Sequence, residues 1–167
     1  ISVLNNVSCP TTSSTSFTFD EANGTCGNGT TATELFISEV YDATTGDFHL
    51  VEIFNGTASS VNLSTYTVRV IATGNNGTST IDIPLNNYNL AAGAVYVLSI
   101  GNSSSTCPSV TADQTKNTGG FNGNDQVLLR KSGSTIDLVK NPNQGAGFSQ
   151  MRKSTVTGPN AVYTSSE

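Results

Sequence analysis

Apolar and polar residues alternate on both sides of an Asn-Gly dipeptide in residues 48–70. This period of two is typical of a strand with one buried face, because successive side chains of a strand point to opposite sides. An Asn-Gly dipeptide is typical of a tight turn. The segment therefore predicts a strand over 48–54, a turn at Asn55 and Gly56, and a second strand over 66–70 that forms a hairpin-like pair with the first.

Similar short apolar runs, separated by turn residues, occur along the rest of the chain. The further predicted strands are 35–41, 81–85, 95–100, 125–131, 135–139 and 148–152. Residues 71–79 and 101–120 are predicted to be polar loops. Apolar residues do not recur with the 3.6-residue period of a helix over two or more turns. The pattern as a whole predicts an all-β fold, a β-sandwich.

Two details of this pattern concern the N-terminal half. Residues 1–33 are rich in Ser, Thr, Asn and Gly, and we interpret them as an N-terminal linker or arm with a short strand at 16–19. The sandwich domain is then 34–167. In its first strand, the alternation assigns Glu39 to the face of Leu35 and Ile37, and Val40 to the opposite face.

Charged residues are scarce, at 11% of the chain against roughly 25% in an average globular protein. Ser, Thr, Asn and Gly replace them, which suits an exported module. The net charge of −5 is uneven, because the acidic excess precedes residue 115 and a weak basic excess follows it. No dense Lys/Arg tract is present, so the composition does not favour nucleic acid as a partner.

The three cysteines, Cys9, Cys26 and Cys107, lack the spacing of a zinc site. In an exported chain we expect one disulfide. A Cys26–Cys107 bond would tie the N-terminal segment to the sandwich, and a Cys9–Cys26 bond would close a local loop. Free buried thiols remain the alternative, and we favour Cys26–Cys107 as the disulfide.

The ends and the hydropathy of the chain carry further expectations. No run of about 18 apolar residues is present, so no membrane insertion is predicted. Neither a signal peptide nor an initiator Met opens the sequence. We therefore expect a piece of a larger polypeptide.

Catalytic and metal chemistry find little support in the residue pattern. His49 is the only histidine; it lies within a predicted strand, and no GxSxG elbow accompanies it, so we interpret it as a side chain on the strand surface. Calcium takes six to eight oxygen ligands, and the candidates for such a site are Glu39, Asp42, Asp47 and Asp125. They have no fixed calcium-binding spacing, so no cofactor is predicted and calcium stays an alternative.

A sugar-binding platform would require exposed aromatic side chains. The chain has no Trp, and its tyrosines are scattered over separate predicted elements, where most would belong to the core or its rim. Carbohydrate binding is therefore the second alternative.

Four blocks in the expected order resemble a known module: LFISEV, HLVEIFNGTASSVNLSTYTV, YNLAAGAVYVLS and FNGNDQVLLRKSGSTIDLV. They are similar to the lamin tail domain, and more closely to the version in exported bacterial multidomain proteins. The closing MRKSTVTGPNAVYTSSE resembles the C-terminal strand of that family. The resemblance covers roughly residues 34–167.

The resemblance implies an immunoglobulin-like β-sandwich that acts as a non-catalytic accessory or interaction module. Glu52 and Asn55 then have scaffold roles, and Leu63 and Tyr66 fill the sandwich. The basic patch of the nuclear lamin relatives has no clear equivalent here, so a protein or a cell-surface component is the expected partner. We expect a monomer that is secreted or held at the cell surface. The alternative is a carbohydrate- or calcium-binding module attached to an exported nuclease or phosphoesterase.

Overall fold

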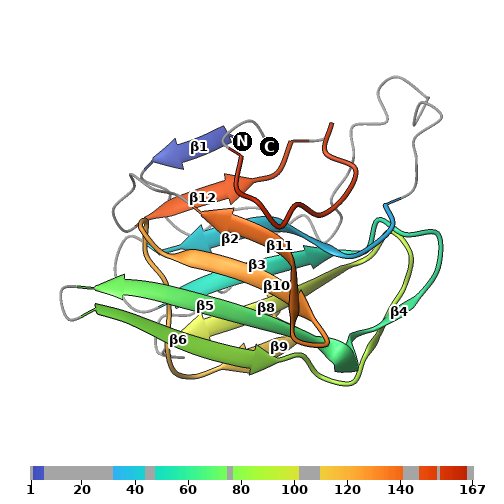
Figure 1. Ribbon diagram of the computed structural model, residues 1–167, viewed down its shortest axis with the longest axis horizontal. Helices are drawn as coiled ribbons and strands as arrows, with labels where there is room; N and C mark the ends of the chain where they lie inside the picture. The colour runs from blue at the N-terminus through green and yellow to red at the C-terminus, as the bar shows by residue number, and fades with distance from the viewer. Residues whose placement is uncertain are drawn as a thin grey trace.

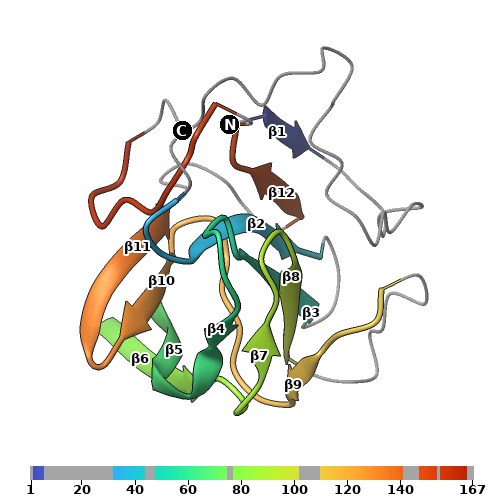
Figure 2. The same ribbon diagram turned by 90° about the vertical axis from the view of Figure 1, so that its right-hand side faces the viewer.

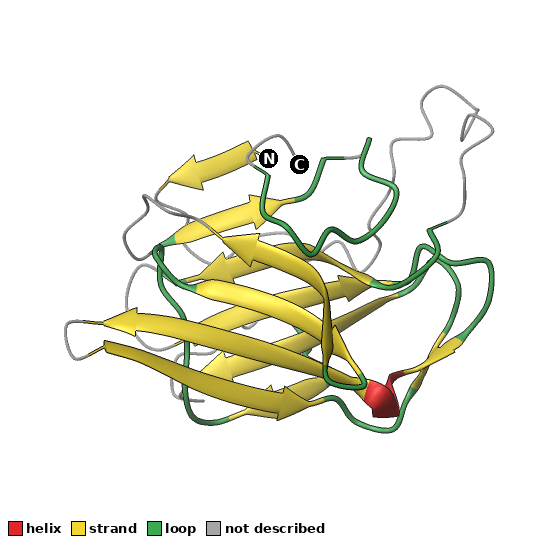
Figure 3. Cartoon of the chain, viewed as in Figure 1, coloured by secondary structure: helices red, strands yellow, loops and turns green. Residues whose placement is uncertain are grey.

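The chain folds into two β-sheets that pack face to face (Figure 1). The computed structural model describes residues 2–5, 32–43, 48–74, 77–101, 110–140, 147–153 and 155–164. Figure 2 shows the sandwich from its side, with one sheet to the left and the other to the right. Strands make up most of the ordered elements (Figure 3), so the predicted all-β sandwich is confirmed.

The larger sheet has six strands in the order β1-β12-β2-β3-β8-β9. Their bounds are β1 Ser2–Asn5, β2 Phe36–Asp42, β3 Phe48–Phe54, β8 Val95–Gly101, β9 Gln114–Lys116 and β12 Phe148–Met151. Neighbours are antiparallel except β8 and β9, which are parallel. β12, the last strand that the structure describes, pairs with β2, the first strand of the predicted domain.

The smaller sheet has four antiparallel strands in the order β11-β10-β5-β6. Their bounds are β5 Tyr66–Gly74, β6 Gly77–Pro84, β10 Gln126–Lys131 and β11 Ser134–Lys140. A two-stranded ribbon of β4 (Val61–Asn62) and β7 (Asn89–Leu90), with the 3-10 helix η1 (Leu63–Thr65), lies at one end of the sandwich.

The core lies between the inner faces of the two sheets, where alternate strand residues meet. Leu63 and Tyr66 are almost fully buried there, as predicted. The other apolar side chains of the described residues that are less than 2% exposed are Leu35, Ile37, Val40, Val51, Ile53, Val68, Val70, Ile83, Leu90, Tyr96, Leu98, Ile100 and Leu129. Branched aliphatic residues dominate this set because they pack well on a pleated surface.

The predicted hairpin in residues 48–70 is wrong in its pairing, although both strands exist. β3 belongs to the six-stranded sheet and β5 to the four-stranded sheet. The intervening residues 55–65 carry the chain from one sheet to the other through β4 and η1. An alternating pattern shows that one face of each strand is buried, and it cannot show whether the two faces belong to one sheet or to opposing sheets.

The predicted face assignment in the first strand is also wrong after Ser38. The register between β2 and β3 shifts between Ile37 and Glu39, which is a β-bulge. A bulge inserts one residue and so exchanges the two faces beyond it. Val40 accordingly joins Leu35 and Ile37 in the core, and Glu39 lies on the outer face.

Both predicted loops contain strand residues. Residues 71–74 and 77–79 extend β5 and β6 into one long hairpin. Thr and Ser side chains give this hairpin no apolar alternation, which explains the misassignment. In the segment 101–120, Gln114–Lys116 forms β9 beside β8.

The N-terminal residues include two contacts to the sandwich. Ser2–Asn5 forms β1, which pairs with β12, and the Ala32 backbone N–H donates to the Gly56 carbonyl at 3.0 Å. The predicted strand at 16–19 and the cysteines Cys9, Cys26 and Cys107 lie outside the described residues, so the disulfide remains a prediction.

Asn55 ends β3 and organises the crossing between the sheets. It is fully buried. Its Nδ2 donates to the carbonyls of Ser59, Leu90 and Ala91 at 2.9–3.1 Å. Its Oδ1 accepts from the Thr57 backbone N–H at 3.0 Å. One amide side chain thus satisfies backbone groups of two separate loops, which supports the predicted scaffold role.

We predict that Asn55→Ala lowers the free energy of unfolding by roughly 1–3 kcal/mol, because it leaves buried carbonyl groups without donors. Urea unfolding followed by circular dichroism measures the loss. Asn117→Ala changes an exposed asparagine and should stay within about 0.5 kcal/mol of wild type. Equal stability of the two variants would refute the role of Asn55.

Candidate functional site

The carboxylates proposed as calcium ligands lie on different faces of the fold. Glu39 is on the outer face of the six-stranded sheet, and Asp42 is buried at the C-terminal end of β2. Asp125 belongs to the loop before β10, at the other sheet. Asp47 lies outside the described residues. Across the part of the chain that the structure describes, no group of three or more His, Cys, Asp or Glu side chains could hold a metal ion.

His49 is buried rather than on the strand surface, which corrects the prediction. It is 5% exposed. Its ring lies 4.8 Å from that of Phe121, and its Nδ1 is 2.9 Å from Oδ1 of the opposing Asp42. The other oxygen of Asp42 accepts the Gly147 backbone N–H at 3.2 Å. The pair joins β2, β3 and the start of β12, and the motifs of sequence analysis could not have revealed this.

Asp125 fastens the loop before β10 to the end of β5. Its Oδ1 accepts the Thr73 backbone N–H at 2.6 Å, and its Oδ2 accepts the Asn122 N–H at 2.8 Å. Asn124 Nδ2 donates to the Thr73 carbonyl at 3.3 Å. Asp and Asn side chains in turns commonly form hydrogen bonds with neighbouring backbone groups. Both oxygens of the Asp125 carboxylate thus accept a backbone N–H.

Glu39 and Glu52 form an unusual pair, directly opposite each other on β2 and β3. Ser149 Oγ donates to Glu39 Oε1 at 2.6 Å, and Ser38 Oγ donates to Glu52 Oε1 at 2.7 Å. Burial raises the pKa of both carboxyl groups, and the charge of Glu39 raises that of Glu52 further. Like charges directly opposite each other weaken a sheet, so this pair is a cost at neutral pH.

The tyrosines do not form a platform for a sugar ring. Tyr41, Tyr66 and Tyr96 are buried. Burial and the hydrogen bond to Glu34 raise the pKa of Tyr66 to about 12, so its hydroxyl stays a donor at neutral pH. Tyr88 is 49% exposed and leans on Tyr96, with 5.7 Å between ring centroids. A single exposed ring among the described tyrosines is a weak basis for sugar binding.

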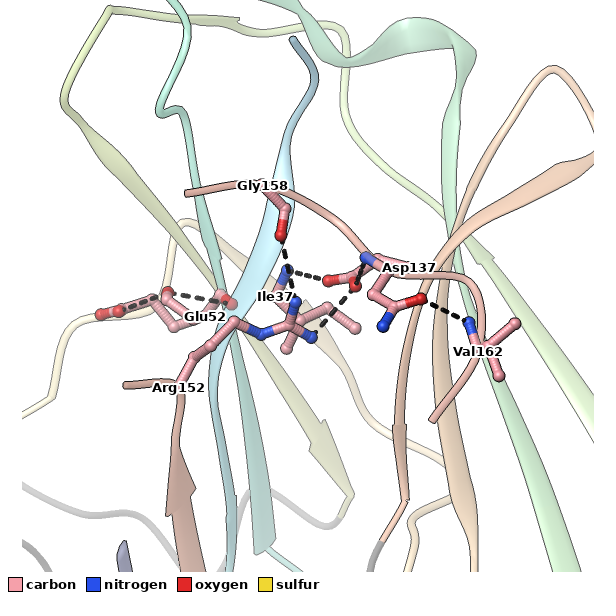
Figure 4. A network of polar contacts seen from close by, with 8 residues as sticks. Ile37, Glu52, Asp137, Arg152, Gly158 and Val162 are labelled. Carbon is pink, nitrogen blue, oxygen red and sulfur yellow. Dashed lines mark hydrogen bonds and ion pairs between the residues drawn. The ribbon is translucent and has the colours of Figure 1, made fainter. Parts of the chain in front are cut away.

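A network of polar contacts centres on Asp137 of β11 (Figure 4). This carboxylate is fully buried. Its Oδ2 accepts the Ile37 backbone N–H at 2.7 Å. Its Oδ1 accepts from Arg152 Nη2 at 3.0 Å and from the Asn160 backbone N–H at 2.7 Å. Burial raises the pKa of Asp137, while the charge of Arg152 and these hydrogen bonds act in the opposite direction.

Arg152 carries the network into the C-terminal segment, residues 155–164. Its guanidinium lies over the Phe36 ring at 5.7 Å and donates to the Gly158 carbonyl at 3.4 Å. The Leu138 backbone N–H donates to the Asn160 carbonyl at 3.0 Å. The C-terminal segment thereby lies against the outer edge of β11 and links both sheets.

Sequence analysis missed this buried ion pair, although both residues occur in the quoted family blocks. Asp137 follows an apolar residue in a strand, and Arg152 follows β12. An acid flanked by apolar residues in a strand, as Asp137 is by Ile136 and Leu138, is a signal for a buried partner, because an unpaired buried charge is very costly. The partner itself cannot be chosen from several basic residues without the fold.

A cavity of about 20 Å³ is lined by Ile37, Gln150, Arg152 and Thr164, among others. This volume holds about one water molecule. The contacts of Asp137 with Ile37, Arg152 and Asn160 link the two sheets and the C-terminal segment.

The outer face of the four-stranded sheet carries threonines, a few apolar side chains and a small basic excess. We call it the threonine face; its residues include Thr67, Arg69, Ile71, Thr73, Thr78, Thr80, Asp82, Gln126, Leu128, Arg130, Leu138 and Lys140. Arg69 donates from Nε to Asp82 Oδ1 at 2.6 Å and from Nη2 to Asp82 Oδ2 at 2.5 Å. Arg130 Nη1 lies 4.0 Å from the same Oδ2. Two arginines thus lie at one acid, and with Lys140 the basic residues of this face outnumber Asp82, in a chain whose net charge is −5.

We predict that Asp137→Ala lowers the free energy of unfolding by about 3–5 kcal/mol, because it leaves the buried Arg152 charge uncompensated. Thermal and urea unfolding measure the change. Asp82→Ala removes an exposed ion pair and should cost under about 1 kcal/mol. In the double variant of Asp137→Ala with Arg152→Leu, the loss should be smaller than the sum of the single losses; strict additivity would contradict the pairing.

We predict that Glu52→Gln stabilises the protein increasingly as pH rises above 4.5. A carboxyl whose pKa is raised in the folded state binds more protons there than in the unfolded chain, so its contribution is lost as pH rises through the raised pKa. The glutamine variant lacks this loss. The measurement is the difference in unfolding free energy between variant and wild type from pH 4 to pH 8.

Glu34→Gln serves as the control for the direction of this pH dependence. Burial acts to raise the pKa of Glu34, but hydrogen bonds from Lys131, Tyr66 and the Leu35 backbone hold it below its ordinary value. This variant should therefore become less stable relative to wild type as pH rises. The same pH slope in both variants would refute the assignment.

Comparison with known proteins identifies the family. The family model of the lamin tail domain matches residues 28–142, which includes every strand from β2 to β11. No curated protein matches the chain, and within the described residues no helix is long and apolar enough to span a membrane. The match and the observed sandwich confirm the predicted immunoglobulin-like fold. The chain belongs to the lamin tail domain family.

Proposed function

We propose that this chain is a non-catalytic accessory module of a larger exported protein, and that it attaches that protein to a partner protein or a cell-surface component. Family membership supports an interaction module of immunoglobulin-like fold. The low content of charged residues supports a location outside the cell. The candidate calcium ligands Glu39, Asp42 and Asp125 contact backbone or side chains of the fold. These contacts support structural roles for the three carboxylates.

The observation that carries the proposal is the threonine face. It is open, because no described element covers these four antiparallel strands on that side (Figure 2). Threonine hydroxyls and the Gln126 amide can donate and accept hydrogen bonds. Since basic side chains outnumber Asp82 there, an acidic protein surface is the partner that fits it best.

The proposal predicts that Arg130→Glu and Lys140→Glu weaken attachment at least tenfold together. Reversing two charges turns a small basic excess into an acidic one, which repels an acidic partner. The experiment measures saturable binding of the labelled chain to cell-envelope protein from the source cells, with unlabelled chain as competitor. Raising the salt concentration should weaken binding in parallel.

Lys116→Glu is the matched control, because Lys116 is exposed on β9 of the other sheet. This variant should bind as wild type does. Equal weakening by both sets of variants would contradict the assignment to the threonine face. Loss of binding on nuclease treatment, or phosphoester hydrolysis by the purified chain, would overturn the proposed function itself.

A further inference from the structure

Strand β6 forms one edge of the four-stranded sheet. In Figure 1 it runs along the lower margin of this sheet. The opposite edge, β11, is occupied by the backbone bond from Leu138 to Asn160 of the C-terminal segment. Among the strands described at the sheet edges, β6 is the longest, with eight residues, against three in β9.

The hydrogen-bonding direction of β6 follows from its partner strand. The Thr73 N–H and carbonyl of β5 bind the Asp125 and Asn124 side chains, on the side away from β6. Directly opposed residues of an antiparallel pair both face each other or both face away. Thr78, which opposes Thr73, therefore directs its backbone outward, and so do Thr80 and Asp82 by the period of two.

This edge lacks most of the features that protect natural edge strands. Such strands usually carry lysines, prolines or bulges that prevent pairing with another chain. Thr78, Ser79 and Thr80 are exposed and uncharged, and the charge of Asp82 is bound by Arg69. Pro84 interrupts the edge only at its end, and no register shift accompanies the β5–β6 pairing.

We propose that β6 pairs with β6 of a second copy of this chain, antiparallel and about a two-fold axis at Thr80. Thr80 then opposes its own equivalent, and Thr78 of each copy opposes Asp82 of the other. These residues direct their backbone groups outward, so each pair exchanges both N–H···O bonds. The two four-stranded sheets join into one continuous sheet.

The side chains of β6 suit this self-pairing. On the threonine face, the Thr78 hydroxyl of one copy can donate to the Asp82 carboxylate of the other, which keeps its Arg69 partner. No two like charges are directly opposed. A two-fold contact uses the same residues on both copies, and the sequence around Thr80 meets that requirement. The contact is small, so it forms only at high local concentration, and the dilute chain is monomeric.

Sedimentation equilibrium tests the pairing with two lysine substitutions. The average mass of the wild type should rise toward that of a dimer as concentration increases. Thr80→Lys places two like charges at the axis, and this variant should stay monomeric over the same range. Ser60→Lys, at an exposed loop position, should associate as the wild type does. Unfolding midpoints close to wild type for both variants show that the fold is retained.

Oxidative cross-linking tests the register. T80C brings two Cα atoms to about 5.5 Å, within the disulfide range of roughly 4.4–6.8 Å. T78C leaves them roughly 14 Å apart, four residues out of register. A covalent dimer is expected for T80C alone; T78C shares the natural cysteines and controls for them. A monomeric wild type at the highest concentration, or equal cross-linking by both variants, overturns the proposal.

This self-pairing is separate from the proposed attachment function. The first is measured on the purified chain alone, and the second requires envelope protein. A failure of either experiment leaves the other informative.

Discussion

The fold depends on how the buried Asp137 carboxylate is satisfied. Its three donors come from β2, from the residue after β12 and from the C-terminal segment. β2 belongs to the six-stranded sheet and Asp137 itself to the four-stranded sheet, so the contacts fix one side of the sandwich. Hydrophobic packing between the sheets is tolerant of small displacements, whereas a buried carboxylate with fixed donors is not. This contact therefore sets the relative position of the two sheets.

The same principle recurs wherever the chain crosses between layers. Asn55 at the end of β3 donates hydrogen bonds to loop carbonyls. Asp125 accepts a hydrogen bond from the Thr73 N–H at the end of β5. In each case a polar side chain replaces the partner that a neighbouring strand would have provided, because buried backbone groups must be paired. Asp125, a candidate calcium ligand in the sequence, thus holds a loop of the fold in place.

Most strands could be predicted from the sequence, because burial selects apolar residues within each strand independently of the other strands. The strand containing Ile53 followed from local alternation, and the strands containing Val97 and Leu129 followed from short apolar runs between turn residues. The separation of β3 and β5 into two sheets did not, since it depends on contacts distant in sequence. The bulge at Ser38 reversed the faces of Glu39 and Val40 without any local signal. The buried position of His49 and the Asp137–Arg152 pair likewise depended on neighbours that only the fold brings together.

The place of Arg152 in the chain has a consequence for the order in which the domain forms. Residues 28–142 carry the family match, yet β12, Arg152 and Asn160 follow them. During synthesis Asp137 leaves the ribosome before its partners Arg152 and Asn160. β2 likewise lacks its neighbouring strand until β12 has been made. Domains fold as units during synthesis, so this one stays incomplete until residues 148–160 have emerged. A nascent chain paused before that point would expose a charged core and an unpaired β2 edge to whatever binds unfinished proteins.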